Sequence, residues 1–204
     1  MPAVRFAPAA YTPSPTCSLS TLPSSPGVMT PPYAYSQMSA MPSGPVTFHP
    51  LLVNYNPELR FDVTLPWQNI RGSNQGVFYE SATRPEVAEL HILHPHLVKH
   101  GWVLTITKPA DVPYLRVCDV FEGIYRGLRE TAAQRDYDSL PPDAQAAVGQ
   151  AFVGRYSRMP DARSVTQEKH KGLKRVDFLT RGMRFTFAGL APSKTPGYYD
   201  LTIA

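Results

Sequence analysis

The distribution of proline constrains this chain most, because it separates a segment that cannot form regular structure from one that can. The 204 residues contain 22 prolines, about twice the average usage, and half of them lie in the first fifty residues. Residues 1–45 are mainly Pro, Ser, Thr and Tyr, and Arg5 is their only charged side chain. Such a segment buries too little apolar surface to offset its ordering entropy. We predict a disordered tail over 1–45, with polyproline II character, and a single folded domain over 46–204.

Four Ser-Pro or Thr-Pro pairs fall within this tail, and they begin at Thr12, Ser14, Ser25 and Thr30. Proline-directed phosphorylation at these positions would add charge to a nearly neutral segment. Low-complexity composition also produces such pairs by chance. Both interpretations of the four pairs stay open.

Charge and cysteine usage bound the environment of the chain. The net charge of +4 permits acidic partners without requiring them. Cys17 and Cys118 lie far apart and form no disulfide framework. The N-terminus lacks the apolar core of a signal peptide, and no apolar run reaches the roughly 20 residues that span a bilayer. We expect an intracellular protein, cytoplasmic or nuclear, without a membrane segment.

Strand patterns recur on both sides of two helical patterns. Alternation and β-branched or aromatic content predict strands within 60–65, 87–93, 101–108, 175–179, 183–190 and 198–204. Within the last part, we expect these apolar residues to face a core: Val176, Phe178, Phe185, Phe187 and Leu190. Asp177 would pair with Arg181, with Arg184 or with a loop amide.

Two helices are expected between the strands. Over 115–130, apolar residues recur at helical spacing, and Gly123 and Gly127 lie four apart, which indicates close packing against a neighbour. The second helix lies within 139–159, with Ser139 as its N-cap, and a polar cationic loop follows over 160–172. The order of elements indicates an α+β fold: a mainly antiparallel sheet of about five strands with two helices packed on one face.

The chain resembles a family of uncharacterised domains abundant in mushroom-forming fungi. The motifs FHPLL, FDVTLPW, GWVLTIT, VCDVFEGIYRGL, AFVGRY and RVDFL…FAGL carry the resemblance, in that order, over roughly residues 47–203. The family usually has Trp-Asp at Phe61-Asp62 and Trp at Tyr198 or Tyr199. Aromatic residues replace aromatic residues, so packing is preserved. The resemblance implies a layout and no assigned activity, catalytic residue or cofactor.

A basic segment is the first candidate site. Residues 163–184 contain seven Lys or Arg side chains and two carboxylates. This excess of positive charge permits contact with an anion or a nucleic acid. The candidate contacts are Lys169, Lys171, Lys174, Arg175, Arg181 and Arg184. The excess of charge is small for a nucleic-acid binder. We therefore favour a solvated loop beside a core strand and expect no nucleic-acid partner.

A histidine cluster is the second candidate site. Four of the six histidines, His91, His94, His96 and His100, fall within ten residues. Imidazoles at this density can bind Zn²⁺, but the spacing matches no closed structural site. A polar hairpin loop explains the cluster equally simply, so we expect no metal.

Catalytic motifs are missing from the sequence: it contains no G-x-S-x-G, no Cys with a recognisable His partner and no phosphate-binding glycine loop. The apolar neighbours of Cys118 favour burial over reactivity. We expect a non-catalytic interaction module that binds a protein partner and carries a phosphorylatable tail. The alternatives are an enzyme of unidentified type, a hydrolase or another, and a weak nucleic-acid binder that uses residues 163–184. The sequence does not indicate the oligomeric state.

Overall fold

The computed structural model describes residues 45–53, 59–70, 75–179 and 185–204. The chain divides into Met1–Ala40 and Met41–Ala204, and every described residue belongs to the second unit. The predicted disordered tail lies outside the described residues except for Pro45. The predicted boundary between tail and domain therefore stays a prediction.

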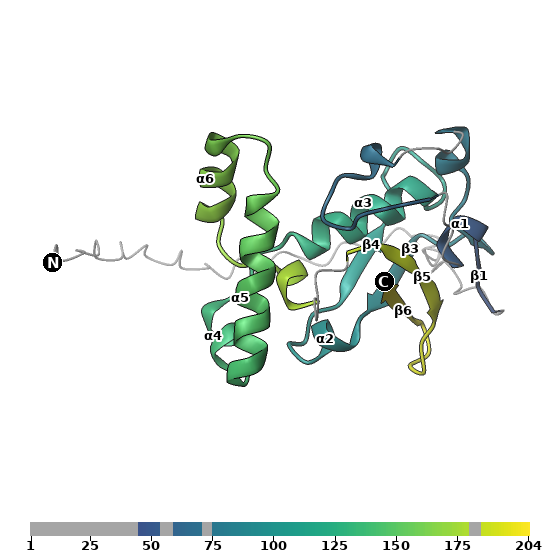
Figure 1. The fold of residues 1–204 in the computed structure, drawn as a ribbon. Helices are drawn as coiled ribbons and strands as arrows, with labels where there is room; N and C mark the ends of the chain where they lie inside the picture. The colour runs from purple at the N-terminus through teal and green to yellow at the C-terminus, as the bar shows by residue number, and fades with distance from the viewer. Residues whose placement is uncertain (1–44, 54–58, 71–74, 180–184) are drawn as a thin grey trace, which may run out of the picture. The chain divides into compact units, whose positions relative to one another are not determined.

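A four-stranded sheet is the framework of the fold (Figure 1). Its strands are β3 (Glu89–Leu93), β4 (Leu104–Thr107), β5 (Phe187–Pro192) and β6 (Tyr198–Ile203). The strand order is β4-β3-β6-β5. The outer pairs are antiparallel, whereas β3 and β6 run parallel in the centre. A second sheet pairs β1 (Thr47–Phe48) with β2 (Thr83–Arg84) antiparallel.

Helix α3 (Val117–Leu128) packs on this sheet. The predicted apolar stripe is buried along its length, and the carboxylate of Asp119 accepts a hydrogen bond from the backbone N–H of Arg116, 3.0 Å away, at the start of the helix. Phe121 contacts Phe61 and Phe187, with ring centroids 4.8 and 5.2 Å apart. These three rings lie at the centre of the main core.

The helices that follow α3 in the sequence gather beside it and the sheet (Figure 1). They are α4 (Gln134–Asp138), α5 (Pro142–Ser157) and α6 (Ala162–His170), followed by the 3-10 helix η3 (Arg175–Phe178). Helix α5 packs against α6 and η3, and a second apolar cluster forms there from Ala132, Val148 and Phe178. Short elements complete the fold: α1 (Pro50–Val53), α2 (Pro95–Val98), η1 (Trp67–Asn69) and η2 (Gln75–Tyr79).

The predicted α+β class with a mostly antiparallel sheet is confirmed, and the two sheets of four and two strands roughly fit the five strands expected. Of the two predicted helices, α3 covers the sheet, while α5 packs mainly on other helical segments. On this side of α5, Arg155 pairs with Glu168 of α6 and with Asp177 of η3.

Two predicted strands are wrong. Residues 60–65 form one isolated bridge, Asp62 with Thr186, and residues 175–178 form the 3-10 helix η3. Four residues are too few to define a period, so a single 3-10 turn such as η3 cannot be told from a short strand by its apolar pattern. The residues expected in the core there, Val176 and Phe178, are nevertheless buried.

The expected loop over 160–172 is also wrong, because it contains α6. Asp161 caps this helix: its carboxylate accepts from the backbone N–H of Ser164 at 2.8 Å and from the Ser164 hydroxyl at 2.7 Å. These hydrogen bonds lower the pKa of Asp161. Ser139 is not the N-cap of α5, since the helix begins after Pro141 with Pro142 in its first turn.

No helix in the described part of the chain is both long enough and apolar enough to cross a membrane.

The glycine pair of α3 gives a stability test. A Cβ at Gly123 would lie 2.5 Å from Ile106 Cγ2, and one at Gly127 would lie 2.8 Å from Leu104 Cδ2, so the predicted close packing is confirmed. Gly123→Ala should lower the free energy of unfolding by about 1–3 kcal/mol, because overpacking outweighs the gain in helix propensity.

Gly149→Ala is the matched control, because a Cβ at this α5 position meets nothing within 4 Å. It should raise the free energy of unfolding by up to about 1 kcal/mol. Urea denaturation measures both variants. Equal effects of the two substitutions would contradict the close approach of α3 to β4.

Candidate functional site

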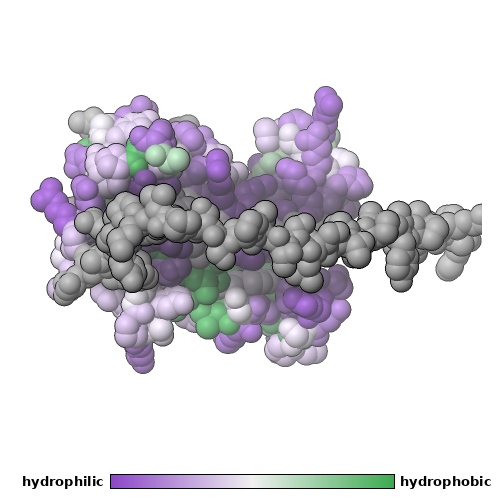
Figure 2. Space-filling view, turned by 180° about the vertical axis from the view of Figure 1, so that it is seen from behind, coloured by the Kyte–Doolittle hydropathy of each residue, from purple (hydrophilic) through white to green (hydrophobic). Residues whose placement is uncertain are grey.

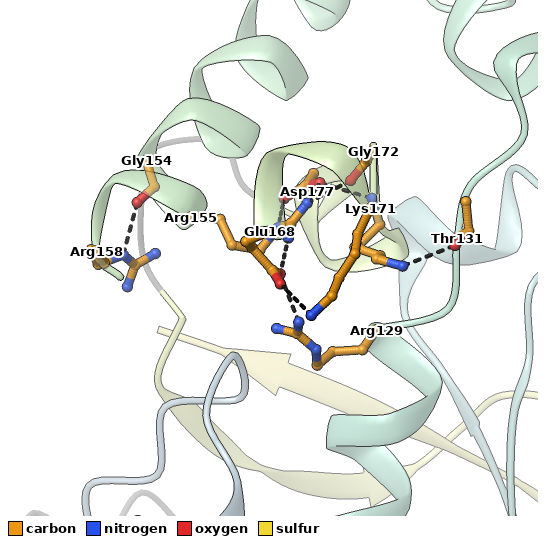
Figure 3. A network of polar contacts seen from close by, with 10 residues as sticks. Arg129, Thr131, Gly154, Arg155, Arg158, Glu168, Lys171, Gly172 and Asp177 are labelled. Carbon is orange, nitrogen blue, oxygen red and sulfur yellow. Dashed lines mark hydrogen bonds and ion pairs between the residues drawn. The ribbon is translucent and has the colours of Figure 1, made fainter. Parts of the chain in front are cut away.

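A buried arginine organises the helical side of the domain. Arg155 follows Val148 and Ala151 on the inward face of α5, and its side chain is only 2% exposed. A charge removed from water in this way requires compensating partners. Figure 3 shows that these partners come from α6, from η3 and from the turn between them.

The Arg155 guanidinium makes four hydrogen bonds. Its Nε and Nη2 donate to the two carboxylate oxygens of Asp177 at 2.8 and 2.9 Å, a bidentate arrangement. Its Nη1 donates to Glu168, and its Nη2 also donates to the carbonyl oxygen of Gly172 at 2.9 Å. One side chain thereby ties α5 to α6 and to η3.

The two carboxylates have further donors. Glu168 accepts from Arg129 Nη2 at 2.6 Å and from Lys171 Nζ at 3.0 Å. Burial opposes the charge of Glu168, but the hydrogen bond from Lys171 and the nearby Arg129 outweigh it and lower its pKa. Asp177 accepts from the backbone N–H of Lys174 at 2.8 Å. We refer to Arg129, Arg155, Glu168, Lys171 and Asp177 as the Arg155 network.

The sequence anticipated part of this arrangement. The predicted contact of Asp177 with a loop amide is confirmed by Lys174, whereas Arg181 and Arg184 lie outside the described residues. The main partner of Asp177, Arg155, was missed. Its place in an apolar stripe was the available signal, since a charge at such a position must be buried and paired.

The Arg155 network fixes one wall of a cavity. Because it holds η3 against α5, it sets the positions of Phe178 and Val148 in the second apolar cluster. A cavity of about 760 Å³ opens beside this cluster, between α2 and the start of α5. Its lining comprises His96, Lys99, His100, Ser139, Leu140, Pro141, Asp143, Ala144, Ala147, Val148 and Phe178.

Aromatic rings support the α2 side of the cavity. The His100 ring stacks on Trp102, with centroids 4.7 Å apart, and meets Phe178 edge-on at 5.0 Å. Arg175 lies over the Trp102 ring at 5.3 Å. Lys99 forms no ion pair with any residue that the structure describes. The cavity therefore combines apolar residues with one lysine, Lys99, one carboxylate, Asp143, and two imidazoles.

The four predicted histidines do not meet at one point, although the rings of His94 and His96 stack with centroids 5.5 Å apart. His96 and His100 line the cavity, while His91 lies on β3 beside Thr105 and Tyr198. His94 caps α2: its Nδ1 accepts from the backbone N–H of His96 at 3.3 Å. Burial, together with the neighbouring His96, lowers the pKa of His94 to about 4. Across residues 45–53, 59–70, 75–179 and 185–204, no three His, Cys, Asp or Glu side chains are grouped to hold a metal.

The predicted basic segment does not form a free cationic surface in its described part. Lys171 pairs with Glu168, and Arg175 pairs with Glu130 at 2.6 Å. Lys174 is buried, its Nζ donates to Thr131 Oγ1 at 2.9 Å, and burial lowers its pKa. Lys169 is exposed on α6. Most of these cations therefore serve internal contacts.

Cys118 lies in the first turn of α3 and is buried, as its apolar neighbours predict. Burial raises the pKa of its thiol, which keeps the thiol protonated. This environment is typical of a structural cysteine.

Asp177→Asn tests the Arg155 network. The amide keeps the shape of the side chain but removes one of the negative charges that compensate the buried guanidinium. The free energy of unfolding should therefore fall by about 3–5 kcal/mol. Glu122→Gln is the matched control, because Glu122 pairs with Arg126 on the outer surface of α3 and should cost about 0.5 kcal/mol. Thermal and urea melts measure both; similar losses would contradict the role of Arg155.

The lowered pKa of Glu168 predicts an acid-dependent stability. Its folded-state pKa lies below the unfolded value, so the stabilisation is present above the ordinary carboxyl range and is lost as the pH falls through the folded-state pKa. Glu168→Gln should lower stability at pH 7 and flatten the decline in melting temperature between pH 5 and pH 3. Glu122→Gln should keep the wild-type slope. Parallel curves for wild type and Glu168→Gln would contradict the assignment.

Comparison with known proteins gives one finding. Residues 16–197 match the model of a family of unknown function, DUF6699. No curated protein and no solved structure matches the chain. The matched range begins within the segment whose composition predicts disorder and ends in the turn before β6. Because the match covers well over half of the sequence, the chain belongs to the DUF6699 family.

Proposed function

We propose that this protein is a non-catalytic interaction module that binds a segment of a protein partner in the cavity between α2 and α5. The observation that carries the proposal is the composition of the cavity. Apolar surface comes from Leu140, Ala144, Ala147, Val148 and Phe178, and the polar side chains of the lining are His96, Lys99, His100, Ser139 and Asp143. Binding cavities of this kind bury an apolar side chain and use a small number of polar groups for orientation.

The rim of the cavity indicates the charge of the partner. Lys99 stands beside two imidazoles, those of His96 and His100. Asp143 is the opposing carboxylate, and it lies in the first turn of α5, where the helix dipole offsets its charge. The favoured partner segment therefore carries a bulky apolar residue next to an acidic residue that faces Lys99.

Surface composition supports a local contact. On the face that Figure 2 shows, outside the grey atoms, apolar surface is confined to small green areas separated by hydrophilic residues. A broad apolar interface needs a large continuous patch. A partner that inserts one or two side chains into a cavity needs much less.

The enzyme alternative has less support. Ser139 is the hydroxyl residue of the cavity lining, and its hydroxyl donates to the carbonyl oxygen of Asp136 at 2.8 Å. The hydroxyl therefore donates to a backbone carbonyl, whereas a serine nucleophile donates to a general base. The nucleic-acid alternative also has less support, because Lys171, Lys174 and Arg175 are engaged within the domain.

Phosphorylation of the tail remains part of the proposal. Thr12, Ser14, Ser25 and Thr30 lie outside the described residues. The family match starts at residue 16 and so includes Ser25 and Thr30. Mass spectrometry of the protein from its native cell tests this directly, since each added phosphate has a defined mass. Unmodified peptides spanning all four positions would contradict it.

Two cavity variants test the proposed function. Ala147→Phe fills the cavity and Lys99→Glu reverses the charge of its rim. Lys169→Glu changes an exposed lysine on α6 and is the matched charge control. Lys169→Glu should capture the same proteins as the wild type, and both cavity variants should fail to capture them. The Kd of a captured protein should rise by about tenfold or more with each cavity variant.

The captured protein must then bind in purified form, measured by calorimetry with the same variants. Thermal melts establish that each variant is folded. A purified partner that binds Ala147→Phe and Lys99→Glu as tightly as wild type would place the interaction elsewhere. Turnover of a small substrate that Ala147→Phe abolishes would instead support the enzyme alternative.

A further inference from the structure

Strand β4 lies at one end of the four-stranded sheet. Its inner side pairs with β3, from Leu104 opposite Ile92 to Thr107 opposite Glu89. In the described part of the chain, no strand pairs with its outer side. An edge of this kind presents unpaired backbone groups that an extended segment can bind.

The register identifies which backbone groups face outward. The backbone N–H of Lys108 donates to the carbonyl of Ala88 at 2.8 Å, so this pair is hydrogen-bonded. Hydrogen-bonded and non-bonded pairs alternate along antiparallel strands. The N–H and C=O groups of Ile106 and Leu104 therefore point toward β3, and those of Thr105 and Thr107 point toward the open edge.

Helix α3 forms a wall beside this edge. A groove of about 280 Å³ follows the strand and is bounded by both elements. Gly123 and Gly127 bring α3 close over β4, since Ile106 and Leu104 lie directly against them. The paired side chains of Glu122 and Arg126, 2.6 Å apart, lie along the wall.

One end of the groove holds a donor without an acceptor. Arg175 lines the groove, and its Nη2 donates to Glu130. Its buried Nε has no hydrogen-bond partner among the described residues. Leaving such a donor unpaired is costly, and because the atom is enclosed, an oxygen of a bound segment reaches it only if the Arg175 side chain shifts.

We propose that β4 and α3 form a second docking site, which binds an extended segment of a partner protein as an additional strand of the sheet. The N–H and C=O groups of Thr105 and Thr107 bind its backbone. The exposed Thr105 and Thr107 side chains favour β-branched residues on one face of the segment. The charged wall of α3 favours polar or charged residues on the other face.

A single peptide strand suits the groove better than a second copy of this chain. Pairing two β4 edges about a twofold axis would bring the charged outer faces of two α3 helices side by side. The groove instead provides a wall and an edge for one strand, over the length of β4. The oligomeric state therefore belongs to the test.

Hydrogen exchange measured by NMR on the full chain tests the site without any substitution. In the free protein, the amides of Thr105 and Thr107 should exchange much faster than those of Leu104 and Ile106. The probes are peptides selected from a random twelve-residue phage library and then synthesised. Their binding should slow exchange at Thr105 and Thr107.

Thr105→Pro removes one outward donor without breaking a bond to β3, because edge strands tolerate proline where the N–H faces outward. The selected peptides should bind this variant at least about tenfold more weakly than wild type. Thr105→Val keeps the N–H and should bind like wild type, as should Lys99→Glu, whose site is the α2–α5 cavity.

The selection and exchange experiments would overturn the proposal if no peptide is selected, or if the peptides slow exchange only around the α2–α5 cavity. Protection of Thr105 and Thr107 in a dimeric free protein would overturn it as well. Equal binding to wild type and a folded Thr105→Pro would also overturn it. If Thr105→Pro does not melt cooperatively, the exchange pattern of the wild type decides.

Discussion

The bidentate pair between Arg155 and Asp177 is the interaction on which the helical half of this domain depends. A buried guanidinium with four hydrogen bonds to α6, η3 and Gly172 leaves little freedom for the segments around it. Its contribution is to geometry more than to net stability, because the desolvation of the ions offsets much of their attraction. Apolar residues of the same volume would hold α5 and η3 together, but they would not fix the direction in which Phe178 points.

The two halves of the domain are held by different physical means. On the sheet side, Phe61, Phe121 and Phe187 pack as a continuous apolar core, and glycines on α3 allow the helix to approach the strands. On the helical side, the apolar cluster is small and charged groups replace much of the packing. The proposed cavity lies mainly on the second side and the proposed edge site mainly on the first, but η3 contributes to both, with Phe178 in the cavity and Arg175 in the groove.

The sequence predicted the parts of the fold in which local pattern and tertiary packing agree. The apolar stripe of α3, its paired glycines and the strands β3 and β4 follow directly from period and composition. The sequence-based prediction was wrong where a capping residue or a buried charge determines the local structure. Helix α6 has mostly polar residues and begins because Asp161 caps it, and η3 reads as a strand because four residues do not define a period. His96 and His100 were singled out as possible metal ligands, and they reach the cavity only because α2 turns the chain there. The partner of Asp177 comes from a residue 22 positions away, a separation that no local pattern encodes.

The parallel pairing of β3 with β6 has a consequence for how the chain reaches this fold. His91 lies opposite Tyr198, more than one hundred residues later in the sequence. During synthesis, β3, β4 and α3 are made long before β6, the strand that completes the centre of the sheet. Until β6 arrives, β3 has one open side, and its unpaired edge is available to other chains. Pairings this distant also slow folding, because the loop between them must close first. A chain whose synthesis has not reached β6 therefore leaves this side of β3 without its partner strand.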